Sequence, residues 1–97
     1  MPLSSAQKKQ IRGLAMQIEA GLHVGREGIT PALVAQTNRL LDQFEMVKFR
    51  VNGGDRDSRN QTIADLATQT HSEVAGIVGK TASIYRYSNS VKKHILD

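Results

Sequence analysis

Two periods of hydrophobic and polar positions alternate along the chain, and together they predict helices and strands in turn. Apolar residues recur at intervals of three and four over residues 4–20, 30–44 and 57–70, which is the spacing of one helix face. Shorter segments with a period of two, or with a short apolar run, lie at 22–24, 46–52, 74–78 and 82–87 and are typical of strands. The predicted order of elements is therefore α-β-α-β-α-β-β.

Capping residues mark where the predicted helices begin. Ser4 and Gln7 have the spacing of a capping box, in which each side chain bonds the other residue's backbone N–H. Thr30-Pro31 combines a capping hydroxyl with a proline at the first helical position, where its missing N–H costs nothing. Asp57 or Ser58 is expected to cap the third helix, and Gly21 is expected to end the first.

Strands that alternate with helices of this length favour an α/β fold with right-handed crossovers. We expect a two-layer sandwich with a four-stranded mixed sheet, mostly parallel, in which a final hairpin adds an antiparallel strand. The 97 residues are expected to form a single domain, because a second core could not be built from what remains after the first. Residues 88–97 are polar and basic, and we expect them to form a flexible tail.

The charge and amino-acid composition favour some classes of partner and exclude some kinds of site. Thirteen lysines and arginines against nine acidic residues give a formal net charge of +4, which favours polyanionic partners. The absence of cysteine excludes disulfides, thiolate metal sites and a cysteine nucleophile. No apolar run is long enough to span a membrane and no signal segment is evident at the N-terminus, so a cytoplasmic protein without membrane contact is expected.

The segment Gly25-Arg26-Glu27-Gly28 lies between a predicted strand and a predicted helix. Two glycines three residues apart allow a sharp bend and leave no Cβ in the way of a phosphate. Backbone amides in such a loop and at the following helix N-terminus favour an anion. A GxxG loop of this kind clamps the nucleotide backbone in KH domains. Many strand-to-helix turns use glycine for geometry alone, and Glu27 opposes an anion here.

Enzymatic signatures are weak. Gly79-Lys80-Thr81 lacks the first glycine of a phosphate-binding P-loop, and the segment that follows it alternates like a strand where a helix is required. His23, His71 and His94 show no metal-ligand spacing. We therefore expect no catalysis, no catalytic residues, no metal, no cofactor and no small-molecule substrate.

Tyr85 and Tyr87 share one face of the last predicted strand, with Arg86 on the other. Aromatic rings on a sheet can stack on nucleic-acid bases. A chain with only two tyrosines and two phenylalanines needs rings for its core, so base stacking and core packing are both possible for these tyrosines.

The order and spacing of these motifs resemble a known family. A Leu-Ser opening precedes a lysine-rich helix, then Gly25-Arg26-Glu27-Gly28, the strand 47–51, and finally Val78-Gly79-Lys80-Thr81 and Ile84-Tyr85-Arg86. Residues 3–87 are similar to the CRM domain (chloroplast RNA splicing and ribosome maturation), specifically to its stand-alone bacterial YhbY-like form. The resemblance implies a fold similar to the C-terminal domain of bacterial translation initiation factor 3, with a KH-like GxxG loop. It also implies RNA binding and association with precursor large ribosomal subunits.

The resulting hypothesis is an RNA-binding ribosome assembly factor, with ribosomal RNA as its partner. A phosphate-tracking surface is expected from the loop residues Gly25, Arg26 and Gly28 and from the surrounding cations Lys8, Lys9, Arg12, Lys48, Arg50, Lys80 and Arg86. The alternative is a protein-interaction module that docks on a ribosomal protein or another factor, which predicts an exposed apolar patch. The oligomeric state is left open.

Overall fold

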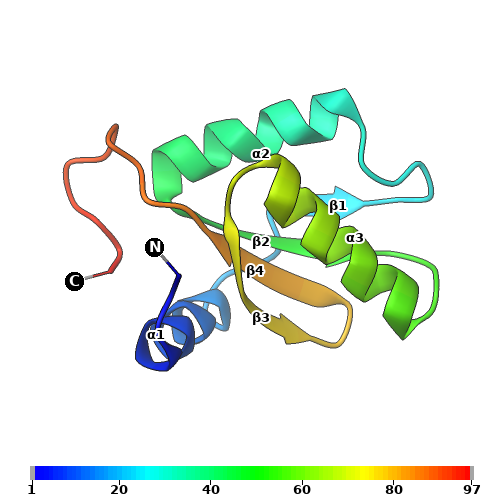
Figure 1. Ribbon diagram of the computed structural model, residues 1–97, viewed down its shortest axis with the longest axis horizontal. Helices are drawn as coiled ribbons and strands as arrows, with labels where there is room; N and C mark the ends of the chain where they lie inside the picture. Colours follow the sequence, from blue (N-terminus) through cyan, green and yellow to red (C-terminus); the bar gives the residue numbers. More distant parts are fainter. Residues whose placement is uncertain (1, 97) are drawn as a thin grey trace.

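The computed structural model describes residues 2–96 and contains three helices and four strands in the predicted order (Figure 1). The predicted α/β class with a four-stranded mixed sheet is confirmed. In chain order the elements are α1 (Ser5–Ala15), β1 (Leu22–Val24), α2 (Pro31–Phe44), β2 (Met46–Val51), α3 (Arg56–Gln69), β3 (Glu73–Val78) and β4 (Thr81–Tyr85).

The strands lie in the order β1-β2-β4-β3. β1 pairs with β2 in parallel, whereas β4 pairs antiparallel to both β2 and β3. β1, β2 and β3 thus run in one direction, but β4 lies between β2 and β3. The prediction of a mostly parallel sheet was wrong for this reason. The turn at Gly79-Lys80 folds β4 back beside β3, and β4 then occupies the place next to β2 that a parallel partner would have taken.

The helices begin largely where the capping residues predict. The Ser4 hydroxyl accepts the Gln7 N–H at 3.1 Å while the Gln7 side chain accepts the Ser4 N–H at 2.9 Å, so the capping box is complete. Thr30 caps α2 as predicted. The cap of α3 is Asp55, not Asp57 or Ser58, because the preceding turn brings its carboxylate to 2.8 Å from the Ser58 N–H.

Both faces of the sheet are covered. One face packs under α2 and α3 around Phe49, Ile84 and Leu66, all fully buried. On the other face Ile11 and Ala15 of α1 pack with Met46 and Ala75. Figure 1 shows α1 below the sheet and α2 above it. Besides the predicted two layers, α1 forms a third, partial layer, because the apolar side chains on the second face of the sheet are also buried.

The first helix is shorter than predicted. It ends at Ala15, well before Gly21, and Leu14 and Ile18 remain exposed. Lys48 on β2 explains this end point, since its ammonium group donates to the carbonyl oxygens of Ala15 at 2.9 Å and Ile18 at 2.8 Å. A cation that binds the free carbonyls of the last turn stabilises a helix end.

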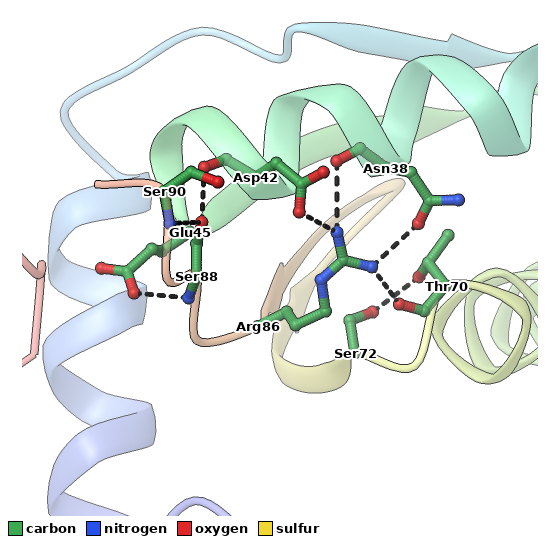
Figure 2. A network of polar contacts seen from close by, with 8 residues as sticks. All are labelled: Asn38, Asp42, Glu45, Thr70, Ser72, Arg86, Ser88 and Ser90. Atoms are coloured by element: carbon green, nitrogen blue, oxygen red, sulfur yellow. Dashed lines mark hydrogen bonds and ion pairs between the residues drawn. The ribbon is translucent and has the colours of Figure 1, made fainter.

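The C-terminal segment (residues 88–96) packs against the domain, which contradicts the predicted flexible tail; Asp97 lies outside the described residues. Its anchor is Glu45, which is fully buried directly after α2. The Glu45 carboxylate accepts the Ser88 N–H at 2.9 Å and the Ile95 N–H at 3.0 Å, and it contacts His94 Nδ1 at 2.7 Å. Figure 2 shows Ser88 beside Glu45. The sequence pattern does not reveal this docking, because the segment is polar and its partner is distant in sequence.

Burial disfavours the charged form of Glu45 and would raise its pKa, but the bonds from Ser88, His94 and Ile95 outweigh burial and hold the pKa below its usual value of 4.5. A carboxyl whose pKa is lowered by folding stabilises the protein above its unfolded pKa. That contribution is lost as the pH falls from about 4.5 toward the lower folded value.

We expect Glu45→Gln to destabilise the protein by about 1–3 kcal/mol at neutral pH. The hydrogen bonds that the Glu45 carboxylate accepts are charge-assisted, and a neutral amide would weaken some of them and break others. Urea unfolding at neutral pH and between pH 3 and 5 measures this. Wild type should approach the variant as the pH falls. The pKa of Asp55 is also lowered, chiefly by the Ser58 backbone N–H, but Asp55 is present in both proteins and cancels in the comparison. A pH-independent difference would contradict the assignment.

Candidate nucleic-acid interface

A cleft lies where β1 and β2 end. The two strands are parallel, so their carboxyl ends meet at one edge of the sheet, and the Asn52 N–H donates to the Val24 carbonyl oxygen at 2.9 Å across that edge. The loops beyond enclose a hollow of about 290 Å³, here called the loop cleft. Its lining comes from the GxxG loop, the end of β2 and the start of α3: Val24, Gly25, Arg26, Gly28, Val51, Asn52, Gly53, Gly54, Ser58, Arg59 and Thr62.

The two glycines of the GxxG loop differ in what the fold requires of them. The Gly28 N–H donates to the Gly25 carbonyl oxygen at 3.0 Å, which closes a tight turn over Arg26 and Glu27. Gly28 has φ +69°, a conformation that favours glycine. Gly25 has no positive φ, and a Cβ added there would meet open space. The fold therefore needs glycine at Gly28 but not at Gly25.

One helix begins beside the loop cleft: Ser58, Arg59 and Thr62 of α3 line it. The Asp55 carboxylate accepts the Ser58 N–H, and the other unpaired N–H groups of this first turn favour an anion. Gly53 and Gly54 also adopt positive φ, at +83° and +74°, just before α3. Ligands of α/β sheets commonly bind outside the carboxyl ends of the strands, which is where this cleft lies.

Arg59 is a cleft residue that the sequence reasoning missed. It lies on α3, and its guanidinium donates to the Gly54 carbonyl oxygen at 2.8 Å, which leaves further N–H donors. Asp55, four residues earlier, is a helix cap, and residues four apart on a helix lie on the same face. That spacing is the sequence signal that places Arg59 beside the loop.

Three of the predicted cations lie at this edge of the sheet. Arg26 lines the loop cleft. Lys80 is exposed in the β3–β4 turn, and its carbonyl oxygen accepts the Val51 N–H at 2.8 Å, which places the turn beside the end of β2. Arg50 is exposed near the end of β2 and pairs in register with Thr81.

Arg86, by contrast, binds inside the protein. Its guanidinium donates to the side chain of Asn38 at 2.8 Å, to the Thr70 carbonyl oxygen at 2.6 Å and to the carboxylate of Asp42 at 2.8 Å (Figure 2). Only 21% of its side chain is exposed. These bonds join α2 to the end of α3, so the structure gives Arg86 a packing role where the sequence suggested a contact residue.

Two further predicted cations are held by neighbouring segments. Lys48 caps the end of α1, as described above. Arg12 packs its aliphatic part on β3, where a Cβ at Gly76 would collide with it, and its guanidinium reaches the Ala75 carbonyl oxygen at 3.5 Å. Glycine at position 76 thus makes room for an arginine stem.

The remaining predicted cations, Lys8 and Lys9, lie on α1. In Figure 1, α1 is at the lower left of the molecule, whereas the β1–α2 loop is at the upper right. The expected continuous surface is therefore divided, with Lys8 and Lys9 separated from the loop cleft.

The β3–β4 turn does not have the geometry of a P-loop. The chain from Thr81 to Tyr85 is a strand, as the sequence pattern predicts, and no helix N-terminus follows Lys80 to hold a phosphate. Among residues 2–96, no helix has the length and apolar character needed to cross a bilayer.

Comparison with protein families identifies the fold. The model of the CRS1/YhbY (CRM) domain matches residues 3–86. The chain belongs to this family. The predicted resemblance is thereby confirmed, and this CRM domain occupies nearly the whole sequence.

Relatives of this CRM domain include a probable RNA-binding protein of Pseudomonas aeruginosa, 28% identical over 98% of this chain and 91% of the relative. An RNA-binding protein of Haemophilus influenzae is 28% identical to this chain, over 93% of this chain and 91% of the relative. Among solved structures, a Staphylococcus aureus protein described as a candidate RNA-binding protein superimposes with a TM-score of 0.82, at 28% identity and 95% coverage of both chains.

If Arg86 holds α2 to the end of α3, Arg86→Ala should lower the free energy of unfolding by about 1–3 kcal/mol, because a buried carbonyl and an amide lose their donor. Arg39→Ala is the matched control, since Arg39 is exposed on the same helix, and its effect should stay within about 0.5 kcal/mol. Thermal unfolding compares the two. Equal midpoints for both variants would contradict the packing role of Arg86.

Proposed function

We propose that this CRM domain binds RNA through the loop cleft and does not catalyse a reaction. The observation that carries the proposal is the meeting of the GxxG loop, the Gly53-Gly54 turn and the start of α3 around one cleft at the edge of the sheet. The RNA-binding names of its relatives support the same partner.

The chemistry of the cleft suits phosphate groups. Backbone N–H groups at helix starts and around glycines bind anions at close range, and Arg26 and Arg59 add charged donors. Such contacts fix the position of a nucleic acid but carry little sequence information. Arg50 and Lys80 would extend the contact along the backbone. Lys8 and Lys9 on α1 would add affinity only for an RNA long enough to reach them.

In the cell we propose a role in ribosome assembly in the cytoplasm, with RNA of the precursor large subunit as the partner. The resemblance to stand-alone bacterial YhbY-like proteins supports this assignment. Crosslinking in cells, followed by sequencing of the bound RNA, tests it: precursor rRNA of the large subunit should be enriched over other RNAs. Recovery of unrelated transcripts alone would remove the ribosomal assignment but leave RNA binding intact.

A second candidate is a protein-docking role, and one observation favours it. Leu14, Ile18 and Phe44 are exposed and line an apolar groove of about 520 Å³ between α1, α2 and β2. Exposed apolar patches of this kind often mark protein contacts. Binding dominated by this groove would depend little on salt, in contrast to binding by the loop cleft.

Gly25→Ala should weaken RNA binding by about tenfold or more, because a Cβ blocks close approach of the RNA backbone while the fold accepts it. Gly21→Ala is the matched control and should leave RNA affinity unchanged. Like Gly25, Gly21 is exposed, has no positive φ and has room for a Cβ. Unlike Gly25, it lies outside the loop cleft. Fluorescence anisotropy with a labelled single-stranded RNA measures affinity, and thermal unfolding checks stability. Equal affinities of the two folded variants would remove the GxxG loop from the interface.

Contact with three to five phosphates predicts that log K falls against log salt with a slope of roughly −2 to −4. The double variant Arg26→Gln, Lys80→Gln should flatten this slope by about one to two units. Arg39→Gln, at an exposed arginine on the middle of α2, should leave it nearly unchanged. A flat wild-type response between 50 and 300 mM salt would favour the protein-docking candidate.

A further inference from the structure

A second hollow lies at the opposite end of the sheet from the loop cleft. It is formed where β3 begins and β4 ends, and it has a volume of about 470 Å³. Four residues that line this hollow have rings or charges that can contact a ligand: His71, Glu73, Tyr85 and Tyr87. β2 spans the two ends with six residues, so the hollow lies about 20 Å from the loop cleft.

Tyr87 provides a fixed, exposed ring at this hollow. Its residue is 59% exposed, although it directly follows Arg86, which is bound inside the protein. The imidazole of His94 stacks against the ring, with 4.4 Å between the centroids and 18° between the planes. His94 is itself held by Glu45. The docked C-terminal segment therefore supports one face of the Tyr87 ring and leaves most of the residue open to solvent.

His71 is exposed and has a positive φ, a backbone conformation in which glycine is the usual residue. It follows the C-cap of α3 with φ +53°, and the Ser72 N–H donates to the Ala67 carbonyl oxygen at 2.9 Å, the bond of a Schellman motif. Glycine is the usual residue at this position, and asparagine comes next. A histidine at this position places a planar polar ring in the lining of the hollow, although its backbone adopts a strained conformation.

The free charge of the hollow argues against a phosphate, because Arg86, which also lines it, is bound to Asn38, Thr70 and Asp42. The Glu73 carboxylate lines it, and one of its oxygens accepts the Leu3 N–H at 2.7 Å. A carboxylate repels phosphate but accepts hydrogen bonds from the amino and ring N–H groups at the edge of a base. Aromatic side chains bind bases by stacking, whatever the sequence. The hollow thus combines a stacking ring with groups that suit the edge of a base.

We propose that this hollow binds one unstacked nucleobase, which stacks on the open side of the Tyr87 ring while its edge faces Glu73 and His71. The inference rests on the proposed function, because the base belongs to the RNA whose backbone lies in the loop cleft. The two contacts differ in kind: the loop cleft binds phosphates and depends on salt, whereas the Tyr87 hollow binds a base and adds affinity without counterion release.

The experiment uses the full chain and single-stranded RNAs of roughly eight nucleotides. Each RNA carries one 2-aminopurine, moved through successive positions. At one position its fluorescence should be quenched on binding to wild type and to Tyr87→Phe, which keeps the ring. Quenching should be lost with Tyr87→Leu, and the affinity should fall about tenfold with an unchanged salt slope. Ile77→Ala, which removes another exposed apolar side chain away from the hollow, should behave as wild type.

A second measurement leaves the protein unaltered. An abasic residue is moved through the same RNA, and one position should cost about tenfold in affinity to wild type. This test decides the question even if Tyr87→Leu loosens the C-terminal segment. Equal losses with Tyr87→Phe and Tyr87→Leu would overturn stacking, and so would an abasic scan without a sensitive position. Both results would leave RNA binding in place, whereas a wild-type protein that binds none of the RNAs would refute the proposed function itself.

Discussion

The parallel pairing of β1 with β2 is the constraint on which the rest of the molecule depends. Two adjacent parallel strands need a crossover, and α2 supplies it while covering one face of the sheet. The pairing also brings the ends of both strands to one edge. The loops that follow, each with a positive-φ glycine, must then lie side by side, and the start of α3 lies beside them. The loop cleft is thus a consequence of strand direction.

The opposite end of the sheet is closed by buried polar contacts. Arg86 joins α2 to the end of α3, and Glu45 binds the C-terminal segment through two backbone N–H groups and His94. Glu45 itself has φ +65°, a conformation that is uncommon outside glycine and that the surrounding contacts maintain. A buried charge is stable only when its partners are complete, and both groups meet that condition. This rigid end supports Tyr87, while the glycine-rich end presents backbone.

Local features of the sequence predicted most of the secondary structure. The capping box at Ser4, the Thr30-Pro31 helix start and the alternation along β2 each depend on residues a few positions apart, and all three appear as expected. The GxxG turn was also visible, because its hydrogen bond joins residues three apart. At the cap of α3 the local signal predicted Asp57 or Ser58 and was wrong, because the turn before the helix brings Asp55 into the capping position.

The sequence by itself determined the elements, their order, the basic character of the domain and the loop that faces its candidate ligand. Only the tertiary structure decided which cations remain available. Lys48 and Arg86 look like solvent-facing charges in a strand pattern, yet their partners lie 16 to 48 residues away. Arg59 looks like an ordinary helix residue, yet it reaches the loop cleft, and the polar C-terminal segment is bound by Glu45. Periodicity reports which side of an element a residue occupies, but the energy of a charge depends on which distant groups the fold places against that side.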